Sequence, residues 1–280
     1  GDAPWFDREM LSTAYWLSQY YMCTLAEALR LFIPGKKSIA VKSGDIQYKL
    51  KEKMERTFVI TSSGKAAYAA QQVRGKSQLT GLALLLSGSV LSAADLAQKG
   101  VTSSVLRALK AKGWLEEKSR RVLRDSYQHY TVPKETMDLT PEQKVAVIQV
   151  DTARKRGEYR TFLLHGITGS GKTEVYLRLA AQALSDGQQV MVLVPEIGLT
   201  GQIVKRFKAW FGDSVAVAHS KLSASERSDV WEKMRSGRAQ VLIGVRSAVF
   251  CPFQNLGLIV IDEEHETTYK QEERPSYHAR

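Results

Sequence analysis

Residues 166–173, GITGSGKT, have the composition and spacing of a phosphate-binding loop. They fit the pattern G-x-x-x-x-G-K-[ST], in which glycines let backbone N–H groups face the phosphates of a nucleotide. We expect Lys172 to reach the β- and γ-phosphates and Thr173 to ligate Mg²⁺, and the helix that follows to add the partial positive charge of its N-terminus. The remaining predicted nucleotide contacts are Gly166, Thr168, Gly169, Ser170 and Gly171.

Acidic residues follow the apolar stretch LIVI near the end of the chain. We predict that Asp262 holds Mg²⁺, through water, and that Glu263 orients or deprotonates an attacking water. Together with Lys172 they form the predicted catalytic set, with ATP and Mg²⁺ as cofactors. Gln143 precedes the loop along the chain, and two roles are open for it, contact with adenine and capping of a helix, which are compatible.

Elements that could position these side chains are found in residues 137–280. The stretches RTFLLHG, QQVMVLVPE, SVAVAHS, QVLIGVR and LGLIVIDEE are nearly continuous apolar runs, separated by helical patterns. Continuous runs are typical of strands buried on both faces of a parallel sheet. The sequence therefore predicts a doubly wound α/β domain, with the loop between its first strand and the following helix.

Residues 36–136 predict a different kind of domain. SQLTGLALLLSG, SAADLAQKG and TSSVLRALKAKGW read as three helices, and WLEEKSRRVLRDSYQHYTV reads as two strands around a basic turn. This is the order of a winged helix-turn-helix, which places its third helix in a DNA groove. The predicted DNA contacts are Arg107 and Lys110 on the third helix, and Arg120 and Arg121 at the wing. A winged helix that binds only proteins is the alternative.

Charge and composition set limits on the function. Residues 1–135 carry 21 lysines and arginines against 12 acids, and residues 136–280 carry 19 against 17. A basic half beside a nearly neutral half is consistent with a polyanion-binding module, although a generally basic surface explains it equally well. Cys23 and Cys251 are the only cysteines and are far apart, which argues against a disulfide framework and a cysteine-rich zinc site. We see no signal peptide or membrane span and expect a cytoplasmic protein.

Several motifs together indicate a family. LTPEQ, GITGSGKTEVY, VPEIGLTGQ, AHSKLSASER, IGVRSA and VIDEEHETTYKQEERPSYHAR occur in this order. In order and spacing they resemble the superfamily-two helicases, and more narrowly the PriA family of primosomal helicases, which restart replication at abandoned forks. The resemblance covers residues 139–280 strongly and implies that residues 137–280 form a RecA-like helicase lobe.

The resemblance also implies contacts and partners. PEIGLTGQ and GVRSA, the latter with Arg246, would touch single-stranded DNA, and Tyr269 and Tyr277 would lie in an aromatic-rich loop that links DNA contact to ATP hydrolysis. A ring there could stack on a base, with local packing as the alternative. The family suggests 3′–5′ movement on forked and single-stranded DNA, a nucleoid-associated location, and primosome proteins and single-strand-binding protein as partners.

Parts of the family pattern are missing from this sequence. We expect residues 1–35 to be a helical segment, and we expect the second lobe, the zinc region and the N-terminal DNA-end-binding domain to be absent. Zinc is expected in the full-length family member, but we find no zinc ligands here. A fragment of an ATP-dependent helicase that restarts replication by primosome assembly, with little hydrolysis of its own, is the main hypothesis. The alternative is a winged-helix DNA-binding module on a P-loop nucleotide switch without unwinding activity.

Overall fold

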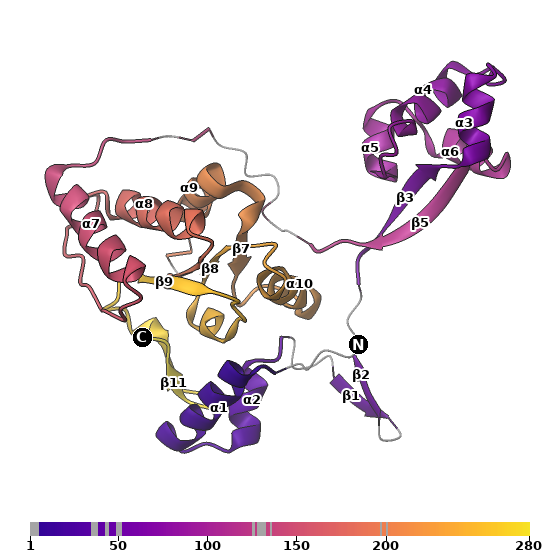
Figure 1. Cartoon of the computed structure of the whole chain (residues 1–280). Helices are drawn as coiled ribbons and strands as arrows, with labels where there is room; N and C mark the ends of the chain where they lie inside the picture. Colours follow the sequence, from indigo (N-terminus) through magenta and orange to yellow (C-terminus); the bar gives the residue numbers. More distant parts are fainter. Residues whose placement is uncertain are drawn as a thin grey trace. The chain divides into compact units, whose positions relative to one another are not determined.

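The computed structural model describes residues 6–34, 39–42, 45–48, 52–124, 127, 133–134, 136–196, 198–199 and 201–280, with the backbone alone for residues 39–48. The chain forms two compact units (Figure 1). One combines Gly1–Leu50 with Leu123–Arg280, and the other is Lys51–Val122. The second unit is narrower than the predicted range 36–136, because the chain on both sides of it belongs to the first unit.

The smaller unit contains the three predicted helices and one more. Its elements are β3 (Met54–Ile60), α3 (Ser62–Ala69), α4 (Lys76–Leu85), β4 (Leu91–Ser92), α5 (Ala93–Gln98), α6 (Ser103–Ala111) and β5 (Leu115–Arg121). Ser92 caps α5 in a reciprocal arrangement with Asp95. Leu82, Leu85, Leu96 and Leu109 are fully buried at the centre of its own hydrophobic core.

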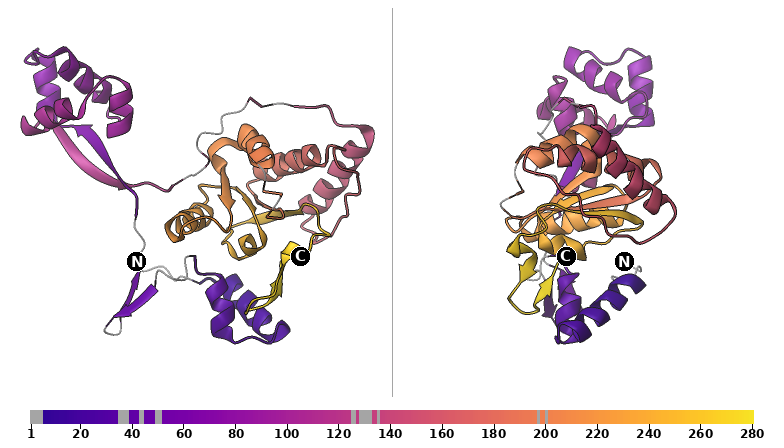
Figure 2. Two further views of the ribbon diagram at one scale, coloured as in Figure 1. Left: turned by 180° about the vertical axis from the view of Figure 1, so that it is seen from behind. Right: turned by 90° about the vertical axis from the view of Figure 1, so that its left-hand side faces the viewer.

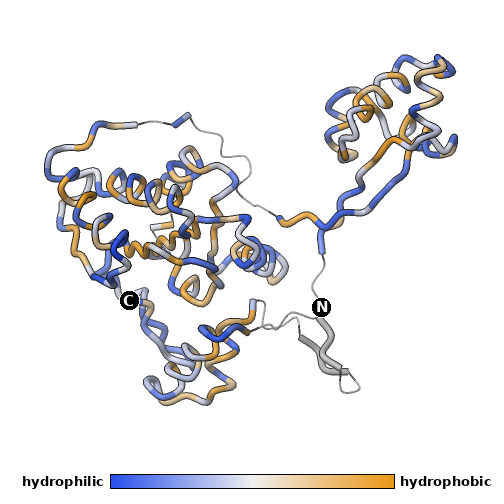
Figure 3. Tube along the Cα trace, in the orientation of Figure 1, coloured by the Kyte–Doolittle hydropathy of each residue, from blue (hydrophilic) through white to orange (hydrophobic). Residues whose placement is uncertain are grey.

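The wing of this unit differs from the prediction. The first of the two strands expected after α6 is β5, and it pairs antiparallel with β3, from Met54 opposite Arg121 to Ile60 opposite Leu115. TFVI in β3 supplies an apolar face for this pairing, and Figure 3 shows the apolar end of β3 beside hydrophilic β5. Residues 125–126 and 128–132, part of the expected second strand, lie outside the described residues.

The larger unit contains a four-stranded parallel sheet. Its strands are β6 (Gln189–Leu193), β7 (Val215–Ala218), β8 (Val241–Gly244) and β9 (Leu256–Ile261), in the order β7-β8-β6-β9. Its helices are α7 (Pro141–Lys155), α8 (Lys172–Ser185), α9 (Gly201–Phe211) and α10 (Ala224–Arg235), with short 3-10 turns η2 (Gly212–Ser214), η3 (Arg246–Phe250) and η4 (Thr267–Tyr269). All five residues of β6 are buried, as expected for an inner parallel strand.

Helices cover both faces of this sheet (Figures 1 and 2). Alternate residues of the strands face α8 and α9 in one apolar cluster, which includes Val192, Ile243 and Phe207. The other face packs against α10 and η3, through residues such as Leu242 and Met234. The predicted α/β architecture with a parallel sheet is therefore confirmed.

The strand predicted before the phosphate-binding loop does not form. Residues 160–167 have neither strand nor helix, and Leu163 is 77% exposed. Of this apolar run, Leu164 is the residue that packs against the core clusters. One packed apolar side chain buries too little surface to stabilise a strand. The strand predicted from this run of apolar residues is therefore wrong.

The N-terminal segment forms two helices, α1 (Arg8–Tyr20) and α2 (Leu25–Leu31), followed by a hairpin of β1 (Ile39–Lys42) and β2 (Asp45–Tyr48). The helices pack on the end of the α/β unit. Phe32 makes an edge contact with Phe250, with ring centroids 5.2 Å apart, and Phe250 in turn contacts Tyr277. The Tyr21 hydroxyl accepts a hydrogen bond of 3.0 Å from the backbone N–H of His278.

The two-residue strands β10 (Lys270–Gln271) and β11 (Tyr277–His278) pair antiparallel after η4. They bring the end of the chain back beside α1 and α2. None of the described helices has the length and apolar character needed to cross a membrane.

Candidate nucleotide-binding site

The loop before α8 has the backbone geometry that its glycines predict. Gly169 and Gly171 lie in the left-handed region, with φ of 82° and 81°, which a residue with a Cβ adopts only with strain. Gly171 is the N-cap of α8, and no side chain caps this end of the helix. Amide donors of the first turn are therefore left for an anion, in the field of the helix dipole.

The loop residues fit a bound phosphate. A Cβ at Gly166 would come within 2.6 Å of the Ser170 hydroxyl, so a larger residue would displace the Ser170 side chain. The Lys172 ammonium donates to the carbonyl of Gly166 at 2.8 Å and lies 3.4 Å from that of Ile167. It is thus folded over the loop, where it can exchange two neutral acceptors for charged phosphate oxygens.

Gln143 connects α7 to this loop. Its side-chain oxygen accepts from the backbone N–H of Thr140 at 3.0 Å, and its side-chain nitrogen donates to the Ser170 carbonyl at 2.9 Å. The predicted capping box is present, since the Thr140 hydroxyl accepts from the Gln143 amide. Capping is confirmed for Gln143, and its contact with adenine stays a prediction.

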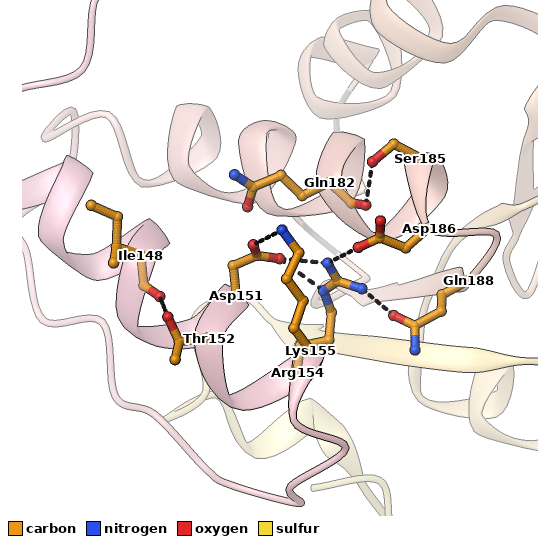
Figure 4. A network of polar contacts seen from close by, with 9 residues as sticks. All are labelled: Ile148, Asp151, Thr152, Arg154, Lys155, Gln182, Ser185, Asp186 and Gln188. Atoms are coloured by element: carbon orange, nitrogen blue, oxygen red, sulfur yellow. Dashed lines mark hydrogen bonds and ion pairs between the residues drawn. The ribbon is translucent and has the colours of Figure 1, made fainter.

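A buried network holds α7 against α8 and the turn that follows α8 (Figure 4). The Arg154 guanidinium contacts the carboxylates of Asp151 and Asp186 and the side-chain oxygen of Gln188. Lys155 donates to the other oxygen of Asp151 at 2.9 Å. Since the Arg154 side chain is only 5% exposed, these partners compensate for the removal of its charge from water. The network thus fixes the helix that carries Gln143.

Asp262 follows β9 directly and contacts α8, the helix after the loop, through Tyr176. Burial raises the pKa of its carboxyl, the Glu263 charge raises it further, and a hydrogen bond from Tyr176 and the Lys172 ammonium lower it, with a net rise above the ordinary value. The Tyr176 hydroxyl, one turn after Lys172 on α8, donates to Asp262 at 3.1 Å, so the structure brings the predicted metal-binding acid to the helix that begins with the predicted phosphate-binding cation. This is the arrangement that a nucleotide site of this type requires.

Glu263 has a strained backbone, with φ of 46°. Its side chain is 41% exposed, and one carboxylate oxygen lies 3.8 Å from a ring nitrogen of His265. A non-glycine residue in the left-handed region costs energy and occurs often at functional sites. The turn after β9 therefore presents this carboxylate to solvent next to Asp262, where a water could bind.

The residues present suit Mg²⁺ bound mainly through a nucleotide. Within the described ranges, no group of three or more His, Cys, Asp or Glu side chains is placed to hold a metal ion. Thr173 and Asp262 supply one hydroxyl and one carboxylate, both half-buried. Mg²⁺ keeps several waters and binds proteins through one or two side chains plus phosphate oxygens, which matches this small donor set.

Two predicted DNA-contact residues are buried. Tyr269 is 1% exposed, and its hydroxyl donates to the backbone carbonyls of Asp262 and, at 3.2 Å, Leu193. Tyr277 is 2% exposed, and burial raises the pKa of its phenol to about 12. The prediction that these rings stack on bases is therefore corrected for this structure: both pack inside the protein, which was the alternative.

Arg246 links two motifs of the family pattern. Its guanidinium donates to the backbone carbonyls of Lys270 at 2.9 Å and Thr268 at 3.3 Å. It therefore holds the segment after the acids rather than pointing freely into solvent. Ile197 and Thr200, in the other segment expected to touch DNA, lie outside the described residues.

The basic residues predicted to contact DNA in the smaller unit are exposed. Lys110 forms an ion pair with Glu117 at 2.6 Å, and Arg120 forms one with Glu55 at 3.1 Å. Arg121 pairs with Glu52 at 3.2 Å, and Arg107 is exposed on α6. Exposed ion pairs contribute little stability, so phosphate groups could compete for these cations at small cost. Contact of this surface with DNA stays a prediction.

Two buried polar side chains near the site, Glu174 and Tyr176, were not predicted from the sequence. The Tyr176 hydroxyl donates to Asp262 at 3.1 Å, and the buried Glu174 carboxylate pairs with Arg178 at 3.1 Å and Arg206 at 2.7 Å. Both Glu174 and Tyr176 stand in α8 just after the phosphate-binding loop. The sequence offered one signal for these contacts, the carboxylate of Glu174 at a helical position that is buried. A buried carboxylate requires partners, but the spacing of residues in the sequence does not identify them.

Comparison with known families supports this picture of the site. Residues 140–279 match the family model of DEAD/DEAH box helicases, and residues 1–34 match that of the PriA 3'DNA-binding domain (3'BD). The second match covers the two N-terminal helices, in a segment where the sequence predicts helices without a DNA-end-binding domain. A helical pattern of this length was too short to indicate a domain by itself.

Relatives named replication restart protein PriA match most of the chain. The Bacillus subtilis protein is 43% identical over 86% of this chain and 32% of its own length. The proteins of Chlamydia pneumoniae and Haemophilus influenzae are 39% and 37% identical, over 98% and 99% of this chain and 36% and 37% of their lengths. The chain thus spans about a third of the length of these relatives.

The expected resemblance to the PriA family is confirmed by these matches. Since the helicase match covers residues 140–279, half of the sequence, the chain belongs to the DEAD/DEAH box helicase family.

Proposed function

We propose that this chain is part of an ATP-dependent 3′–5′ DNA helicase that recognises stalled or collapsed replication forks and restarts replication by primosome assembly. The observation that carries the proposal is the hydrogen bond of 3.1 Å that joins α8, the helix that begins at Lys172, to Asp262 at the end of β9 through Tyr176. A cation and an acid at these two places suit binding and hydrolysis of a nucleoside triphosphate. The PriA relatives support the link to replication restart.

Each residue of the site has a role in this proposal. Lys172 and the free amides of the loop bind the phosphates, and Thr173 and Asp262 hold Mg²⁺, Asp262 through water. Glu263 orients or deprotonates the attacking water. Bound Mg²⁺ neutralises charge that develops on the phosphates. Gln143, which contacts the loop through the Ser170 carbonyl, would read the adenine edge.

DNA is the proposed second ligand. The N-terminal helices, which match the 3'DNA-binding domain, and the basic residues Arg107, Lys110, Arg120 and Arg121 would contact forked or single-stranded DNA. Arg246 would contribute to the contact with single-stranded DNA by holding the segment around Lys270 in place. Primosome proteins and single-strand-binding protein are the proposed protein partners, in the cytoplasm and at the nucleoid.

Nucleotide binding and DNA binding test the proposal separately. Titration of a fluorescent ATP analogue with and without Mg²⁺ should show binding that depends on the metal. Titration of forked and single-stranded DNA at increasing salt should show an affinity that falls steeply, because phosphate contacts release counterions. Absence of nucleotide binding would contradict the proposed motor, and an affinity independent of salt would contradict DNA contact through the basic residues.

A strand-separation assay distinguishes the helicase from the nucleotide switch. The assay uses the longer protein that contains this chain, since the proposed activity belongs to the whole protein. Unwinding of forked DNA that requires ATP supports the helicase. Nucleotide-dependent DNA binding without unwinding supports a winged-helix module on a nucleotide switch.

A further inference from the structure

A tyrosine from the helix of the phosphate-binding loop holds the acid at the end of β9. The Tyr176 hydroxyl donates to Oδ1 of Asp262 at 3.1 Å, across 86 positions of sequence. Tyr176 lies four residues after Lys172, in the second turn of α8. One helix therefore carries both the cation of the site and a donor to its carboxylate.

The position of this hydroxyl is well determined by packing. Tyr176 is 7% exposed and belongs to the main apolar cluster of the sheet, together with Leu177, Val192 and Val260. A ring held in such a cluster has few alternative rotamers, so its hydroxyl points to one place. The carboxylate of Asp262 is thus oriented by a group that cannot easily move away.

The backbone of the same acid is also fixed. The Tyr269 hydroxyl donates to the carbonyl of Asp262, and the amide of Asp262 donates to the Leu193 carbonyl at 2.9 Å. With the main chain held in this way, the direction of the carboxylate depends on its side-chain torsions. The hydrogen bond from Tyr176 to Oδ1 restricts those torsions, and the backbone N–H of Glu263 also interacts with the carboxylate.

We propose that Tyr176 is a positioning residue that orients the Asp262 carboxylate toward the hydrated Mg²⁺ of a bound nucleotide. The proposal rests on the proposed function, because it assumes a nucleotide in the loop. The tyrosine touches neither the nucleotide nor the metal. It acts by holding one oxygen of Asp262, so that no conformational freedom has to be lost when the metal binds.

The test compares Tyr176→Phe with the unchanged chain. The variant keeps the ring and removes the hydroxyl. The measurement is the Mg²⁺ concentration that gives half-maximal binding of a fluorescent ATP analogue, together with the affinity for the analogue in excess chelator. We expect Tyr176→Phe to need about three- to tenfold more Mg²⁺, the effect of one hydrogen bond. Affinity in chelator should stay unchanged.

Tyr21→Phe is the matched control. The Tyr21 hydroxyl is also hydrogen-bonded, to the amide of His278, but α1 and α2 lie outside the nucleotide site. This variant should keep the Mg²⁺ dependence of the unchanged chain. Thermal unfolding of both variants separates a loss of folding from an effect on the metal.

A double-mutant cycle tests whether the effect passes through Asp262. In the Asp262→Asn background, Tyr176→Phe should cause no further change in Mg²⁺ dependence. An unchanged Mg²⁺ dependence in Tyr176→Phe, an equal shift in Tyr21→Phe, or a full effect in the Asp262→Asn background would each overturn the inference. If the unchanged chain bound no nucleotide at all, the proposed function would fail first.

Discussion

At the scale of single residues, the site is a balance of opposite charges. Lys172 lowers the pKa of the Asp262 carboxyl, whereas burial and Glu263 raise it. In this structure the ammonium is folded over the carbonyls of Gly166 and Ile167. An incoming phosphate offers the lysine a stronger acceptor, so nucleotide binding should depend on this side chain more than on any neighbouring cation.

Replacement of Lys172 by alanine is expected to abolish nucleotide binding and leave most of the DNA affinity. The reason is that the ammonium is the cation placed over the loop, while the basic residues predicted to contact DNA lie elsewhere. Calorimetric titration with Mg²⁺ and ATP measures the nucleotide affinity of the variant, and a DNA titration then measures its DNA affinity. Lys144→Ala, an exposed position on α7, is the control. Joint loss of both affinities would show that the two ligands do not use separate surfaces.

At the scale of elements, the buried network between α7 and α8 has a pH-dependent part. Burial alone would raise the pKa of Asp151, but hydrogen bonds from Lys155 and Arg154 bring it below the ordinary value. An acid whose pKa is lower in the folded state stabilises the fold above its unfolded pKa. That contribution is lost as pH falls from about 4 toward the folded pKa.

We therefore expect the free energy of unfolding to fall with acidification below pH of about 4, and to do so less steeply in Asp151→Asn. The variant should already be less stable at pH 7, since Arg154 would keep one carboxylate partner, Asp186, in place of two. Urea unfolding at several pH values measures the slope. Equal slopes in the variant and the unchanged chain would assign the acid sensitivity to other carboxylates.

At the scale of the whole molecule, the N-terminal helices belong to the α/β unit. Phe32 is 5% exposed and contacts Phe250, in the apolar cluster that also contains Met10 and Trp231. The segment that matches a DNA-binding domain model is thus attached to η3, which follows β8 of the sheet. The stability of the N-terminal helices and the stability of the α/β sheet should therefore be coupled.

Phe32→Ala is expected to destabilise the larger unit by about 3–5 kcal/mol, the usual cost of removing a buried ring. Denaturant unfolding followed by tryptophan fluorescence measures this. Leu25→Ala, at a position that is 45% exposed, should change stability by less than about 0.5 kcal/mol. A small effect at Phe32 would mean that the helices contribute little to the fold of the sheet.

The smaller unit should fold alone. Residues 51–122 have their own apolar core, and all three strands of their sheet belong to this unit. We expect this segment to unfold in one cooperative thermal transition with near-native helical content, measured by circular dichroism. A segment that stops at residue 113 lacks β5 and the antiparallel partner of β3, and it should not show that transition.

Much of the site could be predicted from local sequence. The loop and the acids after an apolar run are contiguous patterns, and the caps at Ser92 and Thr140 depend on residues three positions apart. Such features need only neighbours along the chain. The helices of the smaller unit were predicted for the same reason, by their apolar spacing and end signals.

Tertiary structure alone decided which distant groups meet. The strand partner of β5, the burial of Tyr269 and the hydrogen bond from Tyr176 to Asp262 each join positions far apart or depend on what covers a side chain. The amino-acid sequence determined the chemistry available to this protein, because residue type and local spacing set which groups can bind phosphate. The fold decided which of those groups act together, because burial and long-range pairing follow from the packing of whole elements.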